Sequence, residues 1–153
     1  MSRQKKYFNS FNTTWLVMFL LAIFTWQCKK DPLKGEVGTC PSILSTDPSS
    51  GDTNVVTSIK ITAIFNEAMD AATVNETTFV LYQGANQVSG TVTYSGNTAT
   101  FTPAGYLAIN TYYTATVTTG TQDPYGNALP ANYVWSFKTV SYTHLTLPTN
   151  REV

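Results

Sequence analysis

The residues that could do chemistry in this chain are mainly carboxylates. The 153-residue sequence has one histidine, His144, which lies near its C-terminus. A serine or cysteine nucleophile in residues 40–139 would therefore lack a histidine base, and no spacing typical of zinc ligands is present there. The carboxylates of residues 40–139 are Asp47, Asp52, Glu67, Asp70, Glu76 and Asp123.

Two groups of these oxygens are close in sequence. Glu67 and Asp70 are three residues apart and would share a face of a helical turn, while Asp123 and Asn127 flank a Pro-Tyr-Gly turn. Oxygen ligands suit Ca²⁺, but no calcium-loop pattern is present, and a glycosidase would need two facing carboxylates. We therefore expect these residues to cap turns, with no catalytic residue, no metal and no cofactor.

The N-terminal segment, residues 1–28, has the features of an export signal. A basic patch at residues 3–6 precedes the apolar run 15–24, which is shorter than the about 20 residues of a membrane-spanning helix. This pattern predicts a secretory signal. Cys28-Lys29-Lys30-Asp31 resembles the start of bacterial lipoproteins, particularly of Bacteroidetes type, although Thr25-Trp26-Gln27 departs from their usual pattern. The resemblance implies that Cys28 is acylated; the alternative is an uncleaved signal anchor.

The second cysteine, Cys40, has three possible states. If Cys28 is lipidated, no disulfide can form within the chain, and the core alone must hold the domain together. Otherwise Cys28 and Cys40 could pair, or Cys40 could pair with a cysteine outside these 153 residues. We favour a buried, inert Cys40 at the start of the first strand. Residues 29–40 lack a periodic apolar pattern and are predicted to be a tether.

From Cys40 onward, short strands separated by turn signals predict an all-β sandwich. In residues 58–65 the apolar side chains alternate, and Asn66 is expected to cap a single helical turn with Glu67 near its positive end. That turn would carry the chain from one sheet to the other. Residues 95–97 predict a hairpin. The other predicted strands are residues 42–46, 78–82, 87–94, 98–102, 111–119 and 133–139.

The core is predicted to close around Trp135, Phe137, Tyr113 and Phe65. Trp135 would be the largest core residue. Tyr113 is placed to act as a corner tyrosine, with its hydroxyl bonded back to the main chain.

A set of motifs in order along the chain resembles the bacterial Ig-like domain first associated with surface-layer proteins. The resemblance implies an immunoglobulin-like β-sandwich of about seven strands, preceded here by the signal helix. It also implies a module of exported proteins, including adhesins, polysaccharide-acting enzymes and, in Bacteroidetes, ice-binding proteins. It implies no catalytic residues. The motifs are STDP (45–48), ITAIFNEAMD (61–70), GTVTY (90–94), ATFTP (99–103), YTATV (113–117), DPYGNAL (123–129) and WSF (135–137).

The predicted organisation is a signal over residues 1–28, a tether over 29–40, the Ig-like domain over 41–139 and a non-domain tail over 140–153. The tail resembles translated sequencing-adapter sequence, so we expect the natural protein to continue into an effector domain. The alternative is a genuine C-terminal extension.

Charge and surface residues limit the partners. Residues 40–139 hold two lysines against six carboxylates, a net charge of −4, so nucleic acid would be repelled. Tyr106, Tyr112 and Tyr125 are of a type that stacks on sugar rings. We predict a non-enzymatic spacer of an exported cell-surface, outer-membrane or secreted protein, held to the membrane by lipid at Cys28. The alternatives are an adhesin or ice-binding domain that contacts carbohydrate or ice, and an accessory domain of a polysaccharide-active enzyme.

Overall fold

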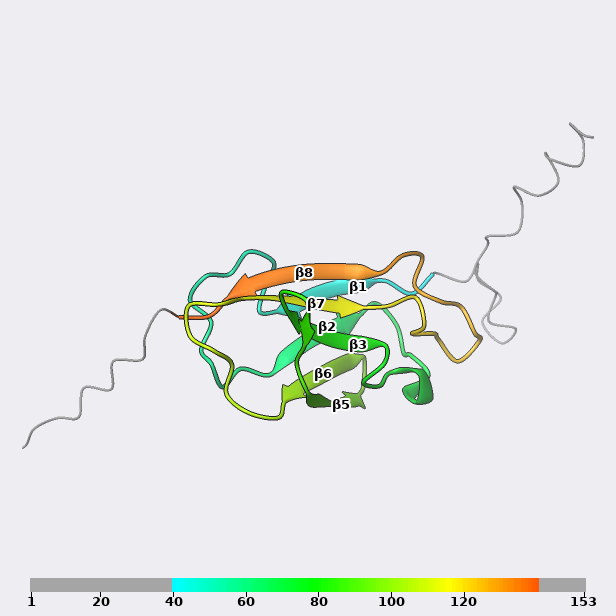
Figure 1. Cartoon of the computed structure of the whole chain (residues 1–153). Helices are drawn as coiled ribbons and strands as arrows, with labels where there is room; N and C mark the ends of the chain where they lie inside the picture. The colour runs from blue at the N-terminus through cyan, green and yellow to red at the C-terminus, as the bar shows by residue number, and fades with distance from the viewer. Residues whose placement is uncertain (1–39, 141–153) are drawn as a thin grey trace, which may run out of the picture. The chain divides into compact units, whose positions relative to one another are not determined.

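The computed structural model describes residues 40–140, which fold into two four-stranded antiparallel sheets (Figure 1). One sheet has the order β1-β2-β6-β5 and the other the order β4-β3-β7-β8. The predicted signal, Cys28, His144, nearly all of the tether and all of the predicted tail except Val140 lie outside the described residues. The strands are β1 (Ile43–Asp47), β2 (Ile61–Phe65), β3 (Phe79–Gln83), β4 (Asn86–Gln87), β5 (Gly90–Ser95), β6 (Thr98–Pro103), β7 (Tyr112–Val117) and β8 (Tyr133–Lys138).

The predicted all-β sandwich is confirmed. Buried and less buried residues alternate along β2 and along β7, as expected of strands with one face on a core. The register of β2 with β6 places Ile61 opposite Phe101 and Ala63 opposite Ala99. No helix in residues 40–140 is long and apolar enough to cross a membrane.

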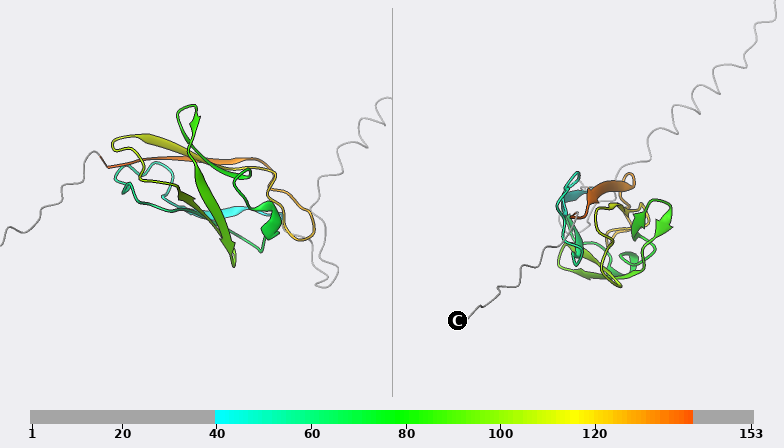
Figure 2. Two further views of the ribbon diagram at one scale, coloured as in Figure 1. Left: turned by 60° about the horizontal axis from the view of Figure 1, so that its bottom comes forward. Right: turned by 60° about the vertical axis from the view of Figure 1, so that its left-hand side comes forward.

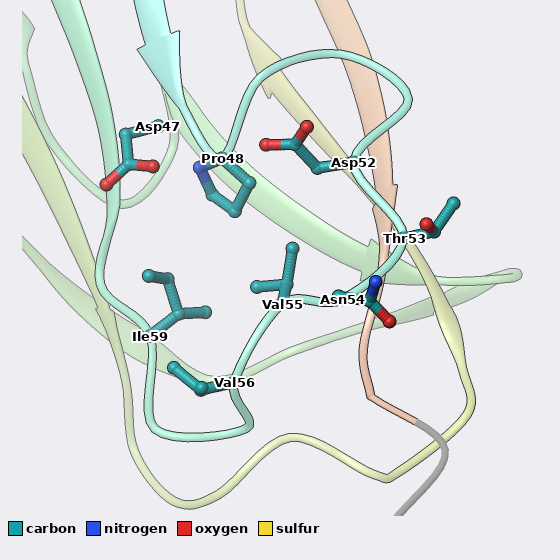
Figure 3. Close-up of a pocket in the computed structure, with 8 residues that line it drawn as sticks. All are labelled: Asp47, Pro48, Asp52, Thr53, Asn54, Val55, Val56 and Ile59. Atoms are coloured by element: carbon teal, nitrogen blue, oxygen red, sulfur yellow. The ribbon is translucent and has the colours of Figure 1, made fainter.

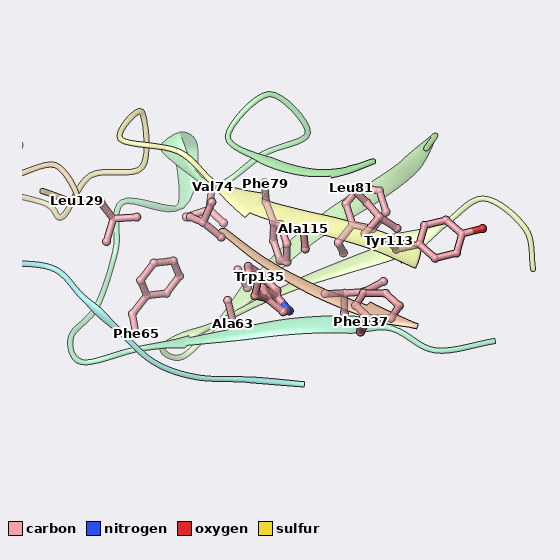
Figure 4. Close-up of a cluster of buried hydrophobic side chains, with 14 of the residues drawn as sticks. Ala63, Phe65, Val74, Phe79, Leu81, Tyr113, Ala115, Leu129, Trp135 and Phe137 are labelled. Carbon is pink, nitrogen blue, oxygen red and sulfur yellow. The ribbon is translucent and has the colours of Figure 1, made fainter. Parts of the chain in front are cut away.

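The core lies between the sheets and is rich in aromatic rings (Figure 4). The Phe79 ring centroid lies 5.9 Å from that of Phe101 and 5.8 Å from that of Trp135. Tyr113 stacks on Phe137 with centroids 5.8 Å apart. All four predicted core residues, Phe65, Tyr113, Trp135 and Phe137, are at most 2% exposed, so that prediction is confirmed.

Two local predictions are also confirmed. The hairpin between β5 and β6 turns at Gly96, whose φ is 60°, a conformation that glycine adopts without strain. The Tyr113 hydroxyl accepts a hydrogen bond from the Ala108 N–H at 2.8 Å, which is the expected corner contact.

The helical turn after β2 is not where we predicted it. The turn is the 3₁₀ segment η1 (Ala71–Thr73), and Asp70 caps it by accepting from the Ala72 N–H at 3.0 Å. Asn66 instead holds the segment before β1, because its Oδ1 accepts from the Ser42 N–H at 2.8 Å and its Nδ2 donates to the Cys40 carbonyl at 3.2 Å. The segment does cross between sheets, from β2 to β3.

The single strand predicted for residues 87–94 is also wrong, because β4 and β5 belong to different sheets. Val88, Val92 and Tyr94 all pack against the core, so the apolar pattern continues through the change of sheet. At Gly90, a Cβ atom would lie 2.5 Å from the Phe101 ring and 2.6 Å from the Thr102 carbonyl. Glycine therefore permits the close approach of β5 to β6.

The described chain enters and leaves at opposite ends of the sandwich (Figures 1 and 2). We call the end with Cys40 and the loops 66–78 and 118–132 the entry end. The exit end holds Val140 and the loops 48–60 and 103–111.

Candidate functional site

The carboxylate of Asp123 holds a turn at the entry end. Asp123 is 3% exposed, and its Oδ1 accepts from the main-chain N–H groups of Tyr125 at 2.9 Å and Asn127 at 2.7 Å. Its Oδ2 accepts from the Asn127 Nδ2 at 2.6 Å. Both oxygens are thus used within the turn, as predicted for a residue that caps it.

Glu67 lies near this turn and has an unusual environment. Its Oε1 is buried and has no hydrogen-bond partner among the described residues. Burial first, and the nearby negative charge of Asp123 second, raise the pKa of Glu67. Asp70 does not share a helical face with Glu67 as we expected, because it caps η1 while Glu67 precedes that turn.

A carboxyl group with a raised pKa is a feature of many general acids. At the entry end, however, the neighbouring carboxylate is committed to three hydrogen bonds. Within residues 40–140, no three histidine, cysteine or acidic side chains form a group that could hold a metal ion. The hydrogen bonds of Asp123 therefore stabilise its own turn, and Glu67 Oε1 lies near that turn without a hydrogen-bond partner in the described part of the chain.

The exit end has an open hollow of about 440 Å³ (Figure 3). Asp47 and Asp52 lie on its rim, and Asp52 accepts from the Ser49 N–H at 2.8 Å. The residues that line the hollow can make hydrogen bonds and van der Waals contacts, but none of them is a histidine, lysine or cysteine. The remaining lining residues are Pro48, Thr53, Asn54, Val55, Val56 and Ile59.

Large apolar side chains are exposed where the chain leaves the domain. Val56 is 52% exposed, Tyr106 84% and Ile109 55%. Main-chain hydrogen bonds bring their loops together around the last described residue: Val140 donates to the Val55 carbonyl at 2.9 Å, and its carbonyl accepts from Asn110 at 2.7 Å. The exit end thus carries an apolar rim around the departing chain.

The three tyrosines considered for sugar binding do not form one platform. Tyr106 is in an exit-end loop, Tyr125 is in the entry-end turn, and Tyr112 is at the start of β7. The Lys138 ammonium lies 5.2 Å from the Tyr112 ring centroid, which is within the range of a cation–π contact. All three are exposed.

Glu76 covers part of a sheet edge. Its carboxylate accepts from the Val92 N–H on β5 at 3.1 Å. Hydrogen bonds from its own main chain and from Val92 lower the pKa of Glu76. A charged group at an edge strand discourages pairing with another chain.

One surface was not recognised from the sequence as a unit. On the outer face of the first sheet, threonines from neighbouring strands stand in register: Thr91 opposite Thr102, and Thr93 opposite Thr100, which is itself opposite Thr62. The alternating threonines are visible in each segment, but the register that aligns them is not. We call Thr62, Thr91, Thr93, Thr98, Thr100 and Thr102 the threonine face.

Cys40 is not the buried, inert cysteine that we favoured. The residue is exposed and its sulfur is disulfide-bonded. The chain has one other cysteine, Cys28, which lies outside the described residues. The prediction that Cys28 is lipidated stays a prediction.

Comparison with protein families settles what kind of domain this is. The family model of the bacterial Ig-like domain matches residues 37–139, which is more than half of the chain. The chain belongs to the bacterial Ig-like domain family. No curated protein matches the sequence.

The bacterial Ig-like domain has solved structural neighbours. The N-terminal part of the bacterial S-layer protein SbsC is similar with a TM-score of 0.51 and 19% identity, over 69% of this chain and 24% of that one. Domains 1–6 of surface layer protein SbsC give 0.52 and 20%, over 69% and 14%. CopC from Methylosinus trichosporium OB3b gives 0.57 and 12%, over 69% and 98%. At these identities the similarity concerns the fold, and the chain spans about a quarter or less of the S-layer structures.

Proposed function

We propose that this bacterial Ig-like domain is a non-enzymatic spacer of an exported cell-surface protein. The observation that carries the proposal is that the chain is fixed by hydrogen bonds at opposite ends of one sandwich. Ser42 is held by Asn66 at the entry end, and Val140 is held between Val55 and Asn110 at the exit end. Units attached before and after the domain are therefore kept apart by its length.

The side-chain chemistry is consistent with a role in positioning. The most buried carboxylate, Asp123, stabilises its own turn, and Glu76 covers a strand edge. The similarity to S-layer protein domains supports a place outside the cell.

Attachment to the membrane is proposed through a lipid on Cys28. The sulfur of a lipidated Cys28 is bonded to carbon of the lipid group and cannot form a disulfide. If Cys28 is the partner of Cys40 in the disulfide, lipidation and that disulfide exclude each other. More than one acyl chain would make the anchoring firm, since each buried methylene contributes about 0.8 kcal/mol.

A labelling experiment separates these two states. We expect the chain, expressed in a bacterial host with a fatty-acid analogue, to take up label and to lose it in Cys28→Ala. Cys40→Ala is the matched control and should keep the label. An unlabelled wild-type chain would contradict the lipid anchor, and non-reducing gels of the same samples would report the disulfide.

We further propose that an effector domain follows the spacer. The exposed rim of Val56, Tyr106 and Ile109 around Val140 supports this, because exposed apolar patches commonly mark contact surfaces. Sequencing the natural gene past codon 140 tests the proposal. An open reading frame of domain length is expected, and a stop codon at that point would contradict it.

A second candidate function is direct contact with carbohydrate or ice, and the threonine face favours it. Its strands lie about 4.8 Å apart, so the paired threonines form a regular array of hydroxyl and methyl groups. Glycan-array binding and inhibition of ice recrystallisation are the two assays. Thr91→Glu with Thr93→Glu should abolish any activity, while Gln83→Glu with Gln87→Glu, on the other sheet, should not. Inactivity of the wild type in both assays would leave the spacer function alone.

A further inference from the structure

The edge of the second sheet is covered by an early part of the chain. Residues 51–55, which follow β1, lie alongside β8, and Val55 forms a parallel bridge with Thr139. Four main-chain hydrogen bonds join the two segments: Gly51 N–H to Ser136 O at 2.7 Å, Lys138 N–H to Asp52 O at 2.6 Å, Val55 N–H to Lys138 O at 3.2 Å and Val140 N–H to Val55 O at 2.9 Å.

These bonds lie where tension on the chain would act. A force that pulls Cys40 and Val140 apart is directed along the sandwich and along β8 (Figures 1 and 2). Residues 51–55 and β8 run parallel to each other, so their outer ends are drawn in opposite directions along the strand axes. The four bonds then slide together in shear. A hairpin opened from its free ends, in contrast, loses its bonds one at a time.

Both flanks of this pairing are reinforced. β8 pairs with β7 through six residue pairs on its other side. The Thr139 hydroxyl donates to the Ala108 carbonyl at 2.6 Å and accepts from the Thr111 N–H at 3.0 Å. At the other end of the force path, β1 is held antiparallel to β2, and Asn66 bonds the chain just before β1.

We propose that the domain bears mechanical load, and that the pairing of residues 51–55 with residues 136–140 is its force-resisting element. The inference rests on the proposed spacer function, because a spacer between a membrane anchor and a surface effector is under tension whenever the effector is held. It adds that the sandwich stays folded under such tension through the parallel pairing rather than through its hairpins.

Single-molecule force spectroscopy on the chain from Lys29 onward, held at its two termini, tests the inference. The wild type should unfold in one cooperative step. In Val55→Pro the unfolding force should fall by about a quarter or more, because proline removes one of the four donors. Ala104→Pro is the matched control: it removes the donor to the Ser89 carbonyl, outside this pairing, and should keep the wild-type force. Urea unfolding of both variants measures the free energy of unfolding that each loses at equilibrium, for comparison with the change in unfolding force.

A second pulling geometry keeps the test decisive if Val55→Pro does not fold. Attachment through Ala85, in the turn between β3 and β4, together with the C-terminus directs force away from the axis shared by residues 51–55 and β8. We expect the wild type to unfold at lower force in this geometry. Equal forces in the two geometries, or equal forces for Val55→Pro and Ala104→Pro, would overturn the inference. Neither result depends on the location of the protein or on a following domain, so the spacer proposal would fail separately.

Discussion

The two ends of the sandwich differ in their side chains: polar groups form hydrogen bonds at the entry end, and large apolar groups are exposed at the exit end. At the entry end, Asp123 closes its own turn and Asn66 holds Ser42, although the buried Oε1 of Glu67 has no hydrogen-bond partner among the described residues. At the exit end, Val56, Tyr106 and Ile109 remain exposed around the departing chain. The difference is consistent with the proposal that the exit end meets a following domain.

The carboxylates show the same contrast. Asp123 is almost fully buried and accepts three hydrogen bonds. Asp52, at the exit end, is exposed and accepts one from Ser49. The contribution of a carboxylate to folding should therefore depend on which end it occupies.

The largest effect is expected from Trp135→Ala. Both ends of the sandwich share the core in which Trp135 lies, so this change should destabilise both ends together. Trp135 is 2% exposed and packs against Phe79, and loss of a buried aromatic side chain costs about 3 to 5 kcal/mol. Urea unfolding measures the change. Val134→Ala, at an exposed neighbouring position, is the control; a loss below about 1 kcal/mol in Trp135→Ala would contradict the core assignment.

The next largest effect is expected from removing a carboxylate, and it compares the stability loss at the entry end with that at the exit end. Asp123→Ala leaves two main-chain N–H groups without their acceptor, and we expect a loss of about 2 to 3 kcal/mol. Asp52→Ala loses one exposed bond and should cost about 1 kcal/mol or less. Similar losses in both variants would show that the ends do not differ in the way described.

A smaller effect depends on pH. Because the pKa of Glu67 is raised in the folded state, its contribution to stability is fully present below its ordinary value of 4.5 and is lost as the pH rises through the folded pKa. Glu67→Gln should therefore be more stable than the wild type at neutral pH, and the difference should vanish on acidification. Chemical denaturation across a pH series measures it.

Glu76 serves as a control for Glu67, because its pKa shifts in the opposite direction. Its pKa is lowered in the folded state, so its ionised form favours folding, and this contribution is lost as the pH falls through the folded pKa. Glu76→Gln should be slightly less stable than the wild type at neutral pH. If the stability of Glu67→Gln and that of Glu76→Gln change in the same direction at neutral pH, the environments assigned to these two groups are wrong.

The smallest effect is expected at the apolar rim. Val56→Ser with Ile109→Ser should change the stability of the 153-residue chain by no more than about 0.5 kcal/mol, because both side chains are already half exposed. In the natural protein with a following domain, the same pair should speed protease cleavage at the junction, whereas Leu44→Ser on β1 should not. A large loss of stability in the chain alone would mean that the rim belongs to the core.

Much of the fold could be predicted from local patterns. The alternation in β2, β7 and β8, the hairpin at Gly96 and the corner contact of Tyr113 all depend on neighbours in sequence. The predictions were wrong where contacts between residues distant in sequence determine the local structure. Asn66 was expected to cap a turn, but its side chain instead bonds Cys40 and Ser42, which lie far from it in sequence.

The candidate surfaces were harder to predict for the same reason. The threonine face depends on the register between β2, β6 and β5, and the pairing of residues 51–55 with β8 joins segments from opposite halves of the domain sequence. The turn of Asp123 and Asn127 was recognisable because its partners lie four residues apart.

The central claim is that residues 51–55 fix the end of the domain to the sandwich through β8, and amide hydrogen exchange tests it most directly. In the chain from Lys29 onward, we expect the Val55 and Lys138 N–H groups, which join residues 51–55 to β8, to exchange as slowly as amides within β7. Exchange of these two groups at the rate of an open loop, while β7 stays protected, would contradict it.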